Sequence, residues 1–234
     1  MKVYSHELVL ITSWSDRRWG DVYDVTELPD NLVAVASSKG LFLVSPGGWT
    51  VATLQLGVVF CSCVVINDCL FAYCACQQMI FKYKLIDKRW QNVKDLNRDH
   101  LRHSWAKLAV SENNTIIYGG SIPDIICEVR ATDGELVEIR DRTDAGDGHH
   151  LLCAADASGS ILVADKQNDR LQVCVRSGGW AELNLDPPVE QPQSAVVINN
   201  KLFVSSDGGN RLTLYTAQVR VDSANARFLP ISHV

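Results

Sequence analysis

Short runs of apolar, mostly β-branched or aromatic residues recur along the chain, each behind a group of polar turn-forming residues. Five such runs begin at Leu32, Leu70, Ile116, Ile161 and Leu202, with spacings of 38, 46, 45 and 41 residues and a mean of 42.5. The groups before them are rich in Asn, Asp, Gly and Ser, which tolerate the positive φ of tight hairpin turns. The pattern predicts a β-rich unit that repeats along the chain.

Further strand-like segments flank each of these runs. Another begins nine or ten residues later, and in four units a third follows, led by Trp49, Trp90, Leu136 and Trp180. One more lies upstream, and no amphipathic helix interrupts the pattern. Four short strands in each unit of this length are typical of a propeller blade. We therefore predict an all-β chain folded as a β-propeller of four-stranded blades.

The repeats fit one propeller domain over residues 1–234. They lie near residues 21–56, 57–96, 97–141, 142–185 and 186–217. Because the last repeat has no clear fourth strand, we expect an N-terminal strand, residues 3–12, to complete that blade and close a ring of five. Alternatively, residues 226–231 are that fourth strand, and the chain is a six-bladed propeller that lacks most of one blade.

Composition and charge narrow the class of protein. The 234 residues include 27 acidic and 22 basic ones, for a formal charge of −5, which disfavours binding to a polyanion. No apolar run approaches the roughly 18 residues that span a membrane, and no export signal is recognisable. The eight cysteines lie mostly in strand-like runs instead of loops, so we expect reduced thiols and a cytoplasmic location.

One repeat resembles a known motif closely. Residues 159–173 contain a strand, then Asp165, Asn168 and Arg170, then a second strand, and this segment resembles an NHL repeat. Residues 201–215 resemble the same repeat more loosely. The resemblance implies that Asp165 and Arg170 hold the blade together, and that the propeller binds RNA or a protein.

Two other repeats are similar to kelch repeats. The second repeat contains Tyr83, Asp87 and Trp90, and the third contains Gly119-Gly120. This order of residues is similar to that of the kelch family. Kelch propellers mostly recruit protein substrates or bind cytoskeletal and signalling partners. Together, the two resemblances imply a recognition surface, although a fold alone does not specify a function.

Four cysteines are weak candidates for a metal site. If Asn67-Asp68 is a two-residue hairpin turn, Cys61 lies opposite Cys74, and Cys63 and Cys76 share the same face. Four thiolates could bind zinc. However, two cysteines separated by one residue on a rigid strand wrap an ion poorly, and a buried free cysteine behaves as a small apolar residue. Core packing is the favoured interpretation.

Several basic and aromatic side chains belong to loops that we expect at one mouth of the propeller. The expected contact residues for a partner are Arg17, Trp19, His100, Arg102, His103, His149, His150, Lys166 and Arg211. Trp and Arg dominate binding hot spots. Histidines near a central channel could instead bind a metal or act as acid and base, but no complete catalytic motif accompanies them.

The favoured function is therefore a non-enzymatic protein- or peptide-recognition module with a substrate-receptor or scaffold role and no cofactor. An RNA-binding NHL-type propeller is the first alternative, although its surface should be basic with exposed aromatic residues. A metal-dependent hydrolase or lyase is the second. We expect no membrane association, and either a monomer or a homodimer paired through exposed edge strands.

Overall fold

The computed structural model describes residues 2–4, 10–86, 89–96, 106–111, 114–120, 125–141, 150–155, 160–174, 179–198, 201–206, 211–216, 219–222 and 225–228. Strands dominate this part of the chain, where the single helical segment is a 3-10 turn, Pro29–Asn31. The described residues contain no helix long and apolar enough to cross a membrane. The chain divides into two compact units.

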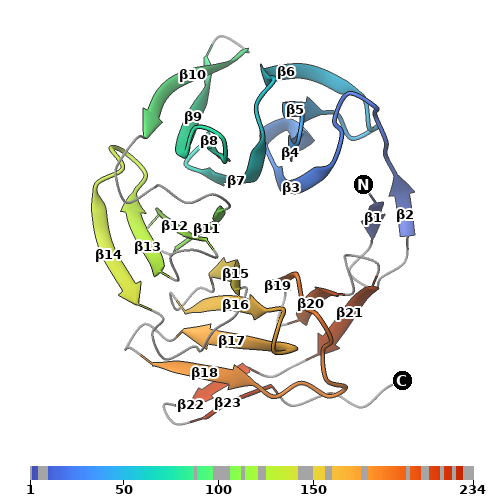
Figure 1. The fold of residues 1–234 in the computed structure, drawn as a ribbon. Helices are drawn as coiled ribbons and strands as arrows, with labels where there is room; N and C mark the ends of the chain where they lie inside the picture. Colours follow the sequence, from blue (N-terminus) through green and yellow to red (C-terminus); the bar gives the residue numbers. More distant parts are fainter. Residues whose placement is uncertain are drawn as a thin grey trace. The chain divides into compact units, whose positions relative to one another are not determined.

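Unit 1 comprises residues 1–108 and 130–135. Two four-stranded antiparallel sheets form most of it (Figure 1). The strands of the first are β3 (Val22–Glu27), β4 (Val33–Ser37), β5 (Gly40–Val44) and β6 (Thr50–Leu56). Those of the second are β7 (Phe60–Ile66), β8 (Cys69–Cys74), β9 (Met79–Ile86) and β10 (Arg89–Leu96). A hairpin of β1 (Lys2–Tyr4) and β2 (Leu10–Ser13) precedes them.

Unit 2 comprises residues 109–129 and 136–234, and holds most of a third sheet. That sheet consists of β11 (Ala106–Val110), β12 (Thr115–Gly120), β13 (Ile125–Arg130) and β14 (Leu136–Asp141). The fourth contains β15 (His150–Ala155), β16 (Ile161–Asp165), β17 (Arg170–Cys174) and β18 (Trp180–Leu183). The fifth has three strands, β19 (Ser194–Ile198), β20 (Lys201–Ser206) and β21 (Arg211–Thr216). A hairpin of β22 (Val219–Asp222) and β23 (Asn225–Phe228) follows.

The predicted blade pattern is confirmed. In each four-stranded sheet, strands that follow one another in the chain lie side by side, as the ribbon shows (Figure 1). Each of the five predicted repeats contains one sheet. The organisation as a single domain, the number of blades and the closure of the ring stay predictions.

The two ends of the chain differ from expectation. The single strand predicted over residues 3–12 is replaced by β1 and β2, which pair with each other. Residues 225–228 form β23, which pairs with β22 and contacts β18. It is therefore not the neighbour of β21 that the alternative prediction required. In both places the described strand pairs with its neighbour in the chain, as two segments joined by a short connection readily do.

Tight turns lie where the sequence predicted them. Asn67 and Asp68 both have positive φ, 48° and 60°, and they join β7 to β8 as a two-residue hairpin turn. Asp30 and Asn114, which precede β4 and β12, also have positive φ. Asn and Asp occupy this conformation more readily than other residues with a side chain, which explains why local sequence was sufficient.

Both faces of the central strands are buried, so the strands read as continuous apolar runs. In unit 1, Ala34 and Ala36 of β4 face a core that includes Phe60 and Leu70 of the second sheet. The alternate residue Val35 faces a second cluster on the other side of the sheet. In unit 2, Leu162 faces the fifth sheet while Ile161 faces the third. Strand alternation thus supplies two apolar faces from one uninterrupted run.

Candidate functional site

The turn between β16 and β17 is closed by a buried carboxylate. Asp165, the last residue of β16, is fully buried. Its Oδ2 accepts hydrogen bonds from Nε of Arg170 at 2.9 Å and from Nδ2 of Asn168 at 2.8 Å, and its Oδ1 accepts one from the backbone N of Asn168 at 3.3 Å. Arg170 Nη1 also lies 3.5 Å from Oε2 of Glu182 on β18. The Asp–Asn–Arg motif therefore stabilises the blade, as the resemblance implied.

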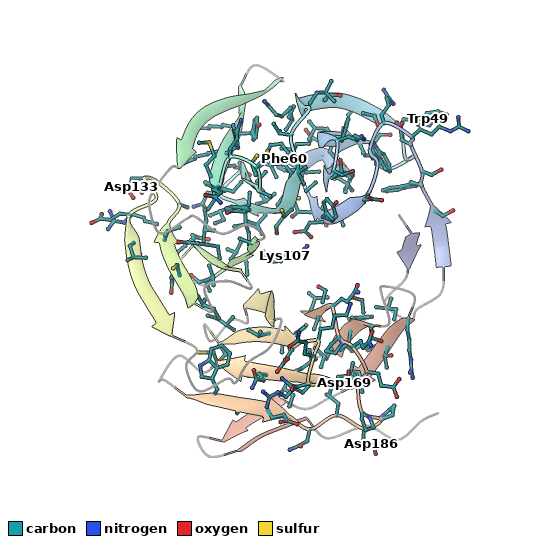
Figure 2. The ribbon with its side chains drawn as sticks, viewed as in Figure 1. Trp49, Phe60, Lys107, Asp133, Asp169 and Asp186 are labelled. Atoms are coloured by element: carbon teal, nitrogen blue, oxygen red, sulfur yellow. The ribbon has the colours of Figure 1, made fainter. Side chains whose placement is uncertain are left out.

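This turn is also fastened to the next sheet. Oδ1 of Asp169 accepts a 2.7 Å hydrogen bond from the backbone N of Gln191, in the segment that leads into β19. Gln193 in turn donates its backbone N–H to the carbonyl of Ser205, at 2.8 Å. We call residues 166–169 and 190–193 the turn surface; Asp169 is labelled in Figure 2. Most of its side chains are exposed, and they carry charges of both signs.

Three of the expected contact residues lie at the corresponding ends of these two sheets. His150 begins β15 and is paired in register with Asp165. Lys166 is the first residue of the turn surface. Arg211 begins β21 opposite Ser206, the last residue of β20. His150 and Lys166 thus lie beside the β16–β17 turn, and Arg211 lies next to Ser205, whose carbonyl accepts the hydrogen bond from Gln193. All three are therefore near the turn surface, and their contact with a partner stays a prediction.

The expected contact residues in unit 1 divide into one exposed and one buried side chain. Arg17 is exposed. Trp19 is only 1% exposed, and its indole Nε1 donates a 3.0 Å hydrogen bond to Oγ1 of Thr50. Trp19 is therefore a core residue rather than a surface contact, because its ring covers the apolar face formed by β4 and β5. The remaining four, His100, Arg102, His103 and His149, lie outside the described residues.

An ion pair organises the segment around Trp19. Asp16 accepts hydrogen bonds from the backbone N and Nε of Arg18, at 2.9 and 3.0 Å, and from Oγ1 of Thr50 at 2.9 Å. The Arg18 hydrogen bonds hold the pKa of Asp16 well below its ordinary value. The same pair raises the pKa of Arg18. The positive charge of Arg18 is thus paired with the carboxylate of Asp16.

A polar network that the sequence did not predict links the first strands of three sheets. Oδ2 of Asp24 on β3 accepts hydrogen bonds from the hydroxyl of Ser62 and, at 3.1 Å, from the backbone N of Cys63, both on β7. Nζ of Lys107 on β11, labelled in Figure 2, lies 3.8 Å from the same oxygen. It also donates to the carbonyl of Tyr23 at 2.7 Å. In the sequence, the signal that could have revealed this network is a charged residue within an apolar run, as Asp24 and Lys107 are.

The four candidate cysteines do not share one face. A bulge interrupts the pairing of β7 with β8, so Phe60, and not Cys61, lies opposite Cys74. Cys63 faces Ala72, and Cys76 lies in the exposed turn after β8. The predicted opposition of Cys61 and Cys74 is therefore wrong, because the extra residue of a bulge shifts the register. Among the described residues, no three His, Cys, Asp or Glu side chains come together where a metal ion could bind.

Buried thiols give the stability of the protein a predicted dependence on pH. Burial raises the pKa of Cys61 from 9.0 to about 11 and that of Cys74 to about 12. Above pH 9 the unfolded chain loses these protons while the folded chain keeps them. The free energy of unfolding should therefore fall as pH rises from 9 to 11, by at most about 1.4 kcal/mol per unit for each thiol. Urea titrations of the reduced protein at several pH values test this. In the Cys61→Ala/Cys74→Ala variant, the free energy of unfolding should fall less steeply with pH between 9 and 11. An unchanged dependence on pH would contradict the assignment.

Solved structures with similar folds come from several functional classes. Virginiamycin B lyase from Staphylococcus aureus, solved as an inactive variant with quinupristin, has a TM-score of 0.62 and 9% identity, covering 92% of this chain and 84% of that one. A putative 6-phosphogluconolactonase from Bacteroides uniformis has a TM-score of 0.66 and 12% identity, covering 93% of this chain and 73% of that one. BamB from Moraxella catarrhalis has a TM-score of 0.56 and 16% identity, covering 88% of this chain and 60% of that one.

These similarities concern the fold alone, since every identity is far below 25%. No family model matches the chain, and no curated protein matches it in sequence. The NHL and kelch resemblances therefore stay predictions at the level of the repeats. The chain is an all-β protein whose antiparallel sheets form a β-propeller fold.

Proposed function

We propose that this protein is a recognition module that binds a protein or peptide partner through the turn surface of unit 2, with His150, Lys166 and Arg211 at its margin. The observation that carries the proposal is the double attachment of the 166–169 turn. Asp165 fixes it to its own sheet, and Asp169 fixes it to the segment before β19. A loop already held in one conformation loses little entropy when it binds.

The charges of this surface favour a peptide over a nucleic acid. Lys166 shares the turn surface with the acidic residues Asp169 and Glu190, so the surface is not a continuous basic stripe. Binding to RNA relies on clustered positive charge. A peptide that carries both charged and polar side chains can pair with surface charges of both signs.

We further propose that Arg17 of unit 1 contributes to partner binding.

A charge reversal tests the proposed surface. The probe is a random peptide library displayed on phage, selected against the immobilised full chain. We expect Lys166→Glu/Arg211→Glu to weaken the selected peptides at least tenfold, which corresponds to about 1.4 kcal/mol. The matched control is Lys201→Glu, at the opposite end of β20. Equal affinity of both variants for the peptides would contradict the proposal.

Two other results would favour the alternative functions. Binding of a random RNA pool with an affinity that falls steeply with salt would indicate a nucleic-acid interface, because phosphate contacts release counterions. Stoichiometric calcium or zinc in elemental analysis of the purified protein would support a metal-dependent hydrolase or lyase. Either result, together with a failure of peptide selection, would replace the peptide-recognition proposal.

We also propose a cytoplasmic location and either a monomer or a homodimer paired through edge strands. The proposal of a cytoplasmic location rests on the sequence, in which the cysteines lie mostly in strand-like runs instead of loops. Native mass spectrometry distinguishes a species of 25.9 kDa from one of twice that mass.

A further inference from the structure

Two cysteine sulfurs approach each other at the end of β8. Cys74 is the last residue of the strand and is fully buried, whereas Cys76 lies in the following turn, residues 75–78, and is exposed. Their Sγ atoms are 3.3 Å apart. A disulfide has an S–S bond of about 2.05 Å, so a movement of little more than about 1 Å would bring the two sulfurs within bonding distance.

The surroundings give the two thiols different roles. Cys76 is the exposed member of the seven described cysteines, and the other six are buried. Cys74 packs in the core of unit 1 with Phe60 and Phe81. Its sulfur also accepts hydrogen bonds from the backbone N–H groups of Cys76 and Gln77. A soluble oxidant therefore reaches Cys76 directly and reaches Cys74 only through it.

We propose that Cys74 and Cys76 form a peroxide-sensitive dithiol, in which Cys76 is oxidised first and Cys74 closes an intramolecular disulfide. In the first step the Cys76 thiolate attacks one oxygen of hydrogen peroxide. An S–O bond forms, the O–O bond breaks and hydroxide leaves, so the sulfur is oxidised to a sulfenic acid while the peroxide is reduced. In the second step the Cys74 sulfur attacks that of Cys76. The S–S bond forms, the S–O bond breaks, and the departing hydroxyl takes the thiol proton to form water.

The fold explains why Cys74 is the partner instead of another nearby thiol. Cys61 lies in the bulge of β7, and Cys63 is held in the core, where its thiol donates to the carbonyl of Ala34 at 3.9 Å. Both are only 2% exposed. Cys74 is two residues from Cys76 in the chain, and the two sulfurs lie where β8 ends and the turn to β9 begins. Closing a disulfide here requires only a local adjustment of the turn.

Peptide mapping of the full chain tests the proposal. The reduced protein is treated with hydrogen peroxide, free thiols are blocked with N-ethylmaleimide under denaturing conditions so that buried thiols also react, and the protein is cut with chymotrypsin. Cleavage after Tyr73 and Phe81 releases residues 74–81, which contain Cys74 and Cys76 but no other cysteine. We expect this peptide to lose both maleimide labels, to be lighter than its reduced form by two hydrogen atoms, and to recover both labels after dithiothreitol.

Matched variants assign the two roles. In Cys74→Ser, and equally in Cys74→Ala, Cys76 should stop at a sulfenic acid that dimedone traps. In Cys76→Ser, the Cys74 peptide should keep its label after the same peroxide treatment. Cys61→Ser should oxidise as the wild type does. A disulfide between Cys61 and Cys76, or accumulation of sulfinic acid on Cys76 while Cys74 remains a free thiol, would overturn the proposal.

Discussion

Replacing Trp19 with alanine is expected to lower the free energy of unfolding by about 3–5 kcal/mol, the usual cost of truncating a buried tryptophan. The side chain is 1% exposed and packs on Val35, Phe42 and Val44. Alanine would leave a cavity beside these residues, and Thr50 would lose the indole donor. Urea unfolding monitored by far-UV circular dichroism measures the effect.

Trp49 provides the matched control for this substitution. Its side chain is 77% exposed, just before β6 of the same sheet. Trp49→Ala should therefore change the free energy of unfolding by no more than about 0.5 kcal/mol. Equal losses in Trp19→Ala and Trp49→Ala would show that the ring of Trp19 is not a core element.

Asp165→Ala is expected to cost about 3–5 kcal/mol, because it breaks a buried ion pair by removing one partner. The carboxylate is completely buried, and it joins Arg170 and Asn168 in the β16–β17 turn. Without it, the guanidinium of Arg170, which is only 25% exposed, loses its principal anionic partner. Urea unfolding at pH 7 measures the loss.

Three further variants, Asp169→Ala, Arg170→Ala and Asp165→Ala/Arg170→Ala, separate this ion pair from a general weakness of the turn. Asp169→Ala removes one exposed hydrogen bond to Gln191 and should cost only about 1 kcal/mol. The double variant Asp165→Ala/Arg170→Ala should lose less stability than the two single variants added together, because no lone charge remains. Strict additivity would argue against a direct ion pair.

Local sequence was enough to predict the repeats and the chemistry of the turns. The Asn67-Asp68 turn was predictable because positive φ at both positions is a property of those two residues and their neighbours. The same holds for Asp165, Asn168 and Arg170, which lie within six consecutive residues and meet across one turn. Their structural role required no contact between distant parts of the chain.

Other features of the candidate sites could not be predicted in this way. Cys61 was displaced by a bulge, which changes the register without leaving a signature in the apolar pattern. Trp19 looked like an exposed aromatic residue in a polar segment, yet it covers one face of the first sheet. Asp24, Ser62 and Lys107 meet because their strands come together from positions about forty residues apart in the chain.

The sequence by itself therefore determined the all-β class, the four-stranded repeat and the hairpin turns, because each depends on interactions within a few residues or one strand pair. The tertiary structure decided which side chains are buried, which thiols approach each other, and how the 166–169 turn is fastened to the segment before β19. These depend on the register of paired strands and on the packing of one sheet against the next, where a shift of one residue moves a side chain to the opposite face.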